Sequence, residues 1–155
     1  MIPQAEQLTE DEQELVYKAP LLVTILIAGA DDDIDKNEKE KAVLAATFNY
    51  QTFVYEPKIE KFYKEVTKNF MGKLNKMIQA LPPKAAERNP EVASELEKLN
   101  DIWPKMDQEF AMLYYESLKS IADQVAKASG GILGLASVSK EEKEWVELNM
   151  LKEPV

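Results

Sequence analysis

The side chains with the most distinctive chemistry lie in segment 28–40, which reads Ala-Gly-Ala-Asp-Asp-Asp-Ile-Asp-Lys-Asn-Glu-Lys-Glu. Four aspartates fall within five positions of this segment, directly after the most apolar run of the chain, residues 21–30. Carboxylate oxygens are ligands for hard cations, so the segment is a candidate site for calcium, magnesium or manganese. The expected metal ligands are Asp31, Asp33, Asp35 and Glu38.

The position of this acidic turn between two expected helices gives a physical reason for a cation. Asp31, Asp32 and Asp33 lie near the carboxyl end of the apolar helix, where the helix dipole disfavours each by about 0.3–1 kcal/mol. Mutual repulsion adds roughly 1 kcal/mol for two carboxylates about 4 Å apart in water. Solvent and salt weaken the same electrostatic repulsion. The alternative to a weak divalent site is therefore a solvated turn in which Asp35 and Glu38 cap the next helix. An EF-hand calcium loop starting at Asp31 is excluded, because the required glycine and glutamate are missing.

The composition removes most catalytic chemistry. The 155 residues include no cysteine and no histidine, which excludes disulfides, thiolate or imidazole metal sites, and Ser-His or Cys-His nucleophilic pairs. We therefore expect no enzymatic activity, no catalytic residue and no organic cofactor. A metal-assisted hydrolase that uses carboxylates is the remote alternative.

Length and hydropathy predict one domain over residues 1–155, with residues 1–8 as a flexible N-terminus. The longest apolar stretch is about ten residues, against the ~20 that a membrane-spanning helix needs, and the first residues do not resemble a signal peptide. The net charge of −9 argues against binding to nucleic acid or to anionic membranes. We expect a cytoplasmic protein that reaches a membrane only through a partner.

The hydrophobic period is helical along nearly the whole chain, which predicts an all-α fold, a compact helical bundle. The first helix is expected to begin at the capping box Thr9-Glu-Asp-Glu12 and to be kinked or split by Pro20. A second helix is expected over 36–53, and a third over 57–81, ending before Pro82-Pro83. The third has an apolar face that we expect in the core, made of Ile59, Phe62, Val66, Phe70, Leu74, Met77, Ile78 and Leu81.

The helical period continues in the second half of the chain with interruptions. A short or kinked helix is expected after Asn89-Pro90, on the period of Val92, Leu96, Leu99 and Trp103. A long helix should then run from about Met106 to Ser129-Gly130-Gly131, where glycines favour a helix end. A final helix is expected to start at Ser139.

The regions around residues 28–38 and 126–142 are similar in sequence. Ala28-Gly-Ala-Asp31 is similar to Ala126-Lys-Ala-Ser129, and Ile34-Asp-Lys-Asn-Glu38 is similar to Val138-Ser-Lys-Glu-Glu142. Segments 34–38 and 138–142 each contain the spacing of a capping box, Asp35 with Glu38 and Ser139 with Glu142. Two helix-turn-helix units related by a pseudo-twofold axis would explain this internal similarity.

At these residues the chain resembles the tellurite-resistance TerB-like family, whose first turn reads Ala-Asp-Gly-Glu-Ile-Asp, followed by a glutamate at the position of Glu38. The glycine-bearing segment 128–142 resembles the family's second turn, whereas residues 55–120 carry no matching motif. The resemblance implies a compact helical domain with pseudo-symmetric repeats, an acidic metal or ligand site, and roles in stress response or membrane-associated assemblies. It implies no established enzymatic activity. Asp32 stands where the family has glycine.

The charges are distributed unevenly along the chain. Residues 1–40 carry eleven acidic side chains and three lysines, whereas residues 57–88 carry eight basic and three acidic ones. Such asymmetry is typical of helices whose polar faces complement each other, or of a surface that another protein binds. The predicted function is a TerB-like module that binds a partner protein and a divalent cation at the turn 31–38. A purely structural interaction domain without metal, such as a homodimer, is the alternative.

Overall fold

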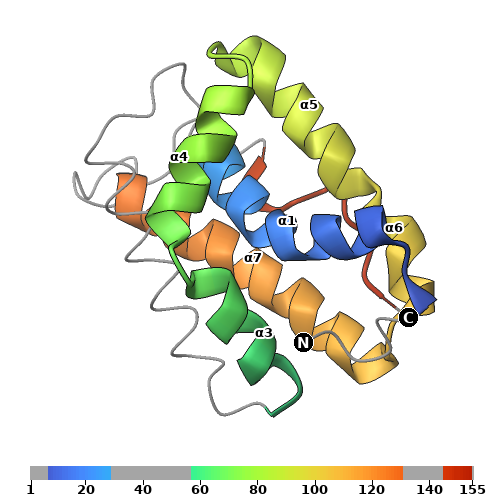
Figure 1. Ribbon diagram of the computed structural model, residues 1–155. Helices are drawn as coiled ribbons and strands as arrows, with labels where there is room; N and C mark the ends of the chain where they lie inside the picture. Colours follow the sequence, from blue (N-terminus) through green and yellow to red (C-terminus); the bar gives the residue numbers. More distant parts are fainter. Residues whose placement is uncertain (1–6, 29–56, 131–144, 155) are drawn as a thin grey trace.

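The computed structural model describes residues 7–28, 57–130 and 145–154. All regular secondary structure in these ranges is helical, which confirms the all-α fold class. None of the described helices is long and apolar enough to cross a membrane. The elements in Figure 1 are α1 (Glu10–Ala28), α3 (Pro57–Thr67), α4 (Phe70–Ala80), α5 (Ala85–Glu97), α6 (Leu99–Ile102), the 3₁₀ helix η2 (Trp103–Lys105) and α7 (Gln108–Gly130).

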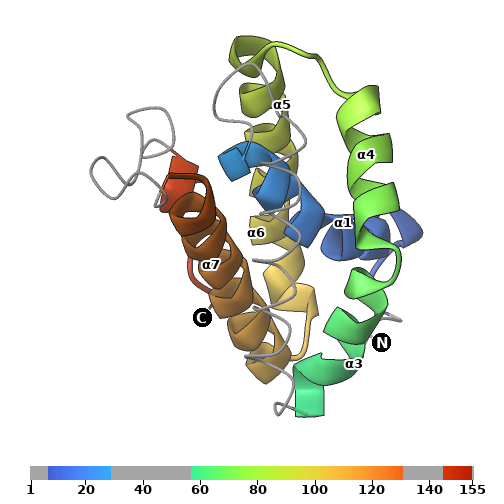
Figure 2. The ribbon, with the colours of Figure 1, turned by 90° about the vertical axis from the view of Figure 1, so that its left-hand side faces the viewer.

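The central element is α1, which contacts α3, α4, α5, α6 and α7. Figure 2 shows α1 crossing between α7 and α4. Every residue in 19–28 is buried, as expected for a helix that is apolar on all sides and surrounded by other helices. The start of α1 confirms the capping box: the Thr9 N–H donates to the Glu12 carboxylate at 2.9 Å, and the Glu12 N–H donates to the Thr9 hydroxyl at 3.1 Å.

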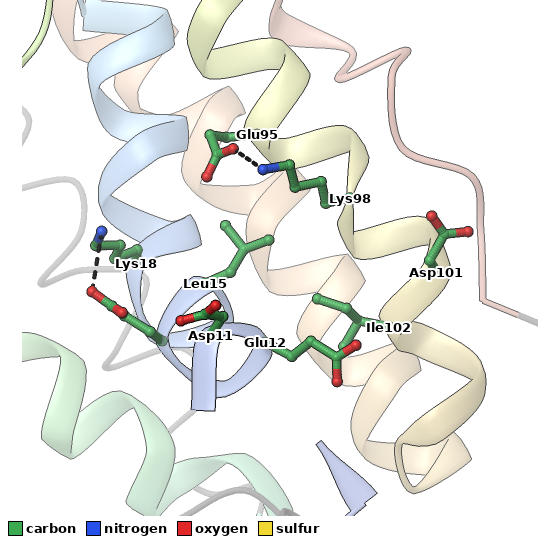
Figure 3. A pocket seen from close by; sticks show the side chains of 9 residues that line it. Asp11, Glu12, Leu15, Lys18, Glu95, Lys98, Asp101 and Ile102 are labelled. Carbon is green, nitrogen blue, oxygen red and sulfur yellow. Dashed lines mark hydrogen bonds and ion pairs between the residues drawn. The ribbon is translucent and has the colours of Figure 1, made fainter. Parts of the chain in front are cut away.

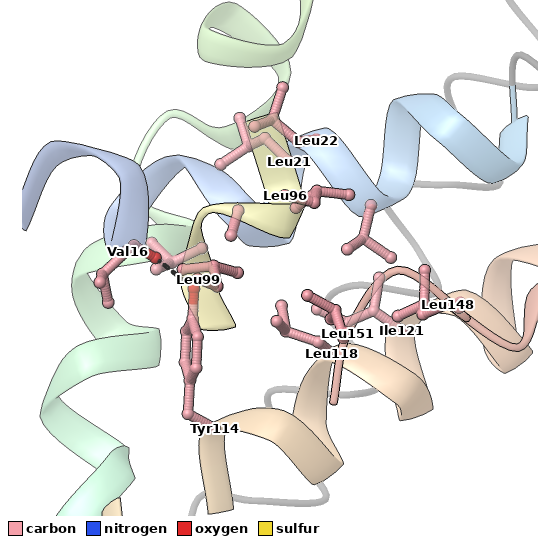
Figure 4. Close-up of a cluster of buried hydrophobic side chains, with 14 of the residues drawn as sticks. Val16, Leu21, Leu22, Leu96, Leu99, Tyr114, Leu118, Ile121, Leu148 and Leu151 are labelled. Carbon is pink, nitrogen blue, oxygen red and sulfur yellow. Dashed lines mark hydrogen bonds between the residues drawn. The ribbon is translucent and has the colours of Figure 1, made fainter. Parts of the chain in front are cut away.

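Pro20 lies inside α1 without splitting the helix, although the axis of α1 changes direction along its length in Figure 1. A proline at this position supplies no N–H to the carbonyl of Val16, four residues earlier. The Tyr114 hydroxyl of α7 donates to that carbonyl at 2.8 Å (Figure 4). Burial raises the pKa of Tyr114 well above its usual value, so the hydroxyl keeps its proton and remains a donor. A side chain from another helix therefore replaces the missing backbone donor.

The single helix predicted over 57–81 is wrong, because the chain forms two helices that are separated at Asn69. Asn69 adopts a left-handed conformation with φ 49°, which asparagine tolerates better than most residues. Gly72 leaves room for this arrangement, since a Cβ there would stand 2.6 Å from Oδ1 of Asn69. The Thr67 hydroxyl donates to the Tyr63 carbonyl at 2.9 Å and so satisfies part of the end of α3.

The apolar face predicted for this region nevertheless packs in or against the core, because both α3 and α4 contact α1. α4 ends at Ala80, just before Pro82-Pro83, as predicted. The members of the face fall into two groups: Ile59, Phe62, Val66, Phe70 and Leu74 are buried, and Met77, Ile78 and Leu81 are partly buried against the core.

The helix expected to start after Asn89-Pro90 begins earlier, at Ala85, so that boundary is wrong. Pro90 lies within α5, where it removes one backbone hydrogen bond without ending the helix. The apolar positions predicted for this part of the chain are all buried: Val92, Leu96, Leu99 and Trp103.

The predicted long helix is confirmed as α7, which is described as far as Gly130. Asp107 caps its start, because the carboxylate accepts a hydrogen bond from the Phe110 N–H at 3.0 Å. The Lys58 ammonium of α3 also donates to Asp107 at 3.0 Å. This pair joins the beginnings of two helices that are far apart in sequence.

The end of the chain lies against α6, η2 and α7. The Asn100 side chain donates to the Met150 carbonyl and accepts from the Lys152 N–H, both at 2.8 Å. The Trp103 indole N–H donates to the Lys152 carbonyl at 2.9 Å. Figure 4 places Leu148 and Leu151, both buried, beside residues of α7.

The remaining predictions on the fold fall outside the described residues. These are the helix over 36–53, the start of the final helix at Ser139, and the two turns of the pseudo-symmetric units. Of the N-terminus expected over 1–8, only Gln7 and Leu8 are described, and Leu8 is buried.

Candidate functional site

The predicted metal ligands Asp31, Asp33, Asp35 and Glu38 lie outside the residues that the structure describes. Within the described ranges, no group of three or more acidic side chains converges in a way that could hold a metal ion. The candidate site that the described residues form is a groove between helices rather than a metal site.

This site is an acidic groove between the first half of α1 and the α5–α6 segment, with a volume of about 430 Å³. Buried Leu15 and Ile102 form its apolar floor. Figure 3 shows carboxylates projecting around this floor from both sides. The groove is lined by five acidic residues and two lysines: Asp11, Glu12, Glu14, Glu95, Asp101, Lys18 and Lys98.

The local sequence explains how α1 presents these charges. Acidic residues in the first turn of a helix are stabilised by its positive end, and α1 begins with Glu10-Asp11-Glu12. Hydrogen bonds from the Lys105 ammonium, at 2.6 Å, and from the Thr9 backbone lower the pKa of Glu12 below its usual value. Glu12 is therefore held in one position and kept ionised at the edge of the groove.

The charges in the groove do not balance. Glu14 pairs with Lys18 at 3.3 Å, and Glu95 pairs with Lys98. Asp11 and Asp101 face the groove from opposite walls, and neither has an ion-pair partner among the residues described. Two carboxylates thus remain available above an apolar floor.

This arrangement suits a ligand with several separated positive charges and at least one apolar group. The carboxylates are spread along three helices, α1, α5 and α6, so they cannot all reach one ion, but they can meet basic side chains on an extended partner. The apolar floor gives such a partner surface to bury. Taken together, the fold and the groove define an all-α protein with an acidic interhelical groove.

Comparison of the chain with family models, with curated proteins and with solved structures finds no match in any of the three. The TerB-like family therefore remains a hypothesis that rests on the residues quoted above.

The sequence indicated one wall of this groove but not the groove itself. The acidic start of the first helix was visible in Thr9-Glu-Asp-Glu12, and the negative excess of residues 1–40 was the signal that could have marked it as a surface. The opposite wall, with Glu95 and Asp101, lies more than eighty residues later in the chain. No local pattern shows that these two segments face each other.

Proposed function

We propose that this chain is a non-enzymatic TerB-like module that binds a basic segment of a partner protein in the acidic groove. The observation that carries the proposal is the pair of uncompensated carboxylates, Asp11 and Asp101, on opposite sides of the apolar floor of Leu15 and Ile102. The partner's lysine or arginine side chains bind the carboxylates, and one apolar side chain lies on the floor.

Exposed charge pairs contribute about 0.2–1 kcal/mol each, so the groove binds weakly and reversibly unless several contacts form together. Such binding is sensitive to ionic strength, because salt screens exposed charges beyond about 10 Å at 0.1 M. The groove therefore acts as a docking surface whose occupancy depends on the number of basic residues in the partner.

The first prediction concerns the two uncompensated carboxylates. A fluorescent peptide with alternating arginine and leucine residues should bind the native protein saturably in fluorescence anisotropy. The double change Asp11→Asn, Asp101→Asn should raise its Kd about fivefold or more, since two charge contacts are lost. The control is Glu91→Gln, Glu116→Gln, which makes the same change in net charge at exposed positions outside the groove. An equal loss of affinity in both variants would show attraction by net charge alone and would contradict the proposal.

A second part of the proposed function is a divalent cation at the turn 31–38, as the sequence predicts. Calorimetric titration of metal-stripped protein with calcium, magnesium and manganese should give saturable heat at millimolar metal or below. The double change Asp31→Asn, Asp33→Asn should abolish that heat, because it removes two of four expected ligands. Heat that survives in this variant would place the cation elsewhere, and absence of heat in both proteins would leave the turn as a helix cap.

The alternative function is a structural domain that associates with itself without metal. The surplus of basic residues in 57–88 over acidic ones favours it, because this segment of one copy could bind the acidic groove of another. Salt-dependent dimerisation in light scattering, weakened by Asp11→Asn and Asp101→Asn, would support self-association over a separate partner.

A further inference from the structure

A second groove, larger and less polar, lies between α1, α3 and α4. It has a volume of about 800 Å³, and apolar atoms make up most of its lining surface. Leu21 and Val66 are buried at its base, while Tyr17 and Met77 are partly buried and face it from α1 and α4. The groove therefore offers an apolar floor between helices that are far apart in the sequence.

The charged side chains at the rim of this groove favour a negatively charged ligand, whereas the acidic groove favours a positively charged one. Its two carboxylates are already paired, Glu14 with Lys18 at 3.3 Å and Glu65 with Lys68 at 3.2 Å. Among the described residues, Lys73 donates to a backbone carbonyl, that of Glu65, at 3.2 Å, and to no carboxylate. Lys76, one turn further along α4, has no hydrogen bond or ion pair with the residues described. Two ammonium groups on one side of α4 are thus left without a carboxylate partner among the described residues.

The wall formed by α4 carries a side chain that can adjust to what lies in the groove. Among the described elements, α4 packs mainly against α1, and it is joined to α3 through the left-handed Asn69. Met77 projects from α4 into the groove, and a methionine side chain adjusts its shape to different apolar groups. Apolar grooves that bind helices of different sequence use methionine in this way.

We propose that this groove docks an amphipathic helix of a partner protein, with apolar side chains at helical spacing on the floor and glutamate or aspartate facing Lys73 and Lys76. Grooves between helices accept such ligands through anchors at positions i, i+3, i+4 and i+7. The charge complementarity of the rim selects an acidic helix over a basic one. The site is separate from the acidic groove, which selects basic segments, although Glu14 and Lys18 form the ridge between the two.

The test uses two designed peptides of about 18 residues, long enough to form a helix. Both carry leucine at i, i+3, i+4 and i+7; one has glutamate at the flanking positions and the other has lysine there. The acidic peptide should bind the full chain saturably in fluorescence anisotropy, with a Kd at least tenfold lower than that of the lysine peptide. The double change Lys73→Glu, Lys76→Glu should raise the Kd of the acidic peptide about tenfold or more.

The matched control is Lys84→Glu, Lys119→Glu, which makes the same charge change at exposed lysines away from the groove and should leave the Kd within about twofold. Because all four lysines are exposed, circular dichroism should show the same helix content in both variants. Equal binding of the two peptides, equal effects of the two variants, or no binding of the acidic peptide would each overturn the proposal. The proposal would also be overturned if the native protein bound decanoate but not the acidic peptide, and if Lys73→Glu, Lys76→Glu abolished the binding of decanoate. The ligand would then be a small amphiphile rather than a helix.

The two proposals can be contradicted independently of each other. The double change Asp11→Asn, Asp101→Asn should weaken binding of the basic peptide and leave binding of the acidic peptide unchanged, because those residues do not line the second groove.

Discussion

Replacing Phe62 with alanine should lower the free energy of unfolding by about 3–5 kcal/mol. Phe62 of α3 is completely buried, and its ring contacts four other aromatic rings. The ring centroids lie at 5.1 Å for Tyr17, 5.3 Å for Tyr63, 5.7 Å for Phe110 and 5.5 Å for Tyr114. The substitution removes the apolar surface of the ring, leaves a cavity between α1, α3 and α7, and ends these aromatic contacts.

Urea denaturation of the native protein and the Phe62→Ala variant measures this difference. The control is Met112→Ala on α7, a side chain of intermediate exposure whose loss should cost clearly less. If the two variants were destabilised equally, Phe62 would not be the central packing residue that its contacts indicate. Equal slopes of unfolding against urea would show that the change acts on stability rather than on the compactness of the unfolded chain.

Replacing Tyr114 with phenylalanine should cost about 1–3 kcal/mol of stability, even though only one oxygen atom is removed. The hydroxyl is the donor to the Val16 carbonyl, which Pro20 leaves without a backbone partner. Without it, a carbonyl in the middle of the buried helix α1 is left unsatisfied, and water cannot reach it. The change therefore costs more than the loss of an exposed hydrogen bond.

A double-mutant cycle with Pro20→Ala isolates this interaction. Alanine at position 20 restores an N–H donor for Val16, so Tyr114→Phe should cost less in that background, by about 1 kcal/mol. Tyr115→Phe is the control, because that neighbouring side chain is only partly buried and its hydroxyl does not bond to Val16. The same cost of Tyr114→Phe in both backgrounds would mean that the hydroxyl acts through another contact.

The candidate site illustrates how the sequence and the structure contribute different information. The acidic turn with Asp31 and Asp33 was visible because its carboxylates are neighbours in the chain, and it remains a prediction. The acidic groove depends on Asp11 and Asp101 standing on opposite walls, which requires α1 to lie against α6. Charge composition indicated an acidic end of the molecule, but it could not indicate where an apolar floor would lie beneath it.

The sequence by itself determined the features that depend on neighbouring residues. Thr9 and Glu12 form the capping box, the apolar face from Ile59 onwards is in the core, and Pro82-Pro83 follows the end of α4. Each of these depends on interactions within about four residues, which the helical period and the chemistry of caps describe.

Tertiary structure decided the rest, because the energies that settle it come from contacts between distant residues. Pro20 is tolerated inside α1 because Tyr114, on another helix, supplies the missing donor. The break at Asn69 costs a few backbone hydrogen bonds, and it lets α3 and α4 each pack against α1. Local propensity cannot predict either result, since a buried polar group or an interrupted helix is stable only when the surrounding helices satisfy it. The two grooves arise in the same way, from the positions that packing gives to the charged edges of α1.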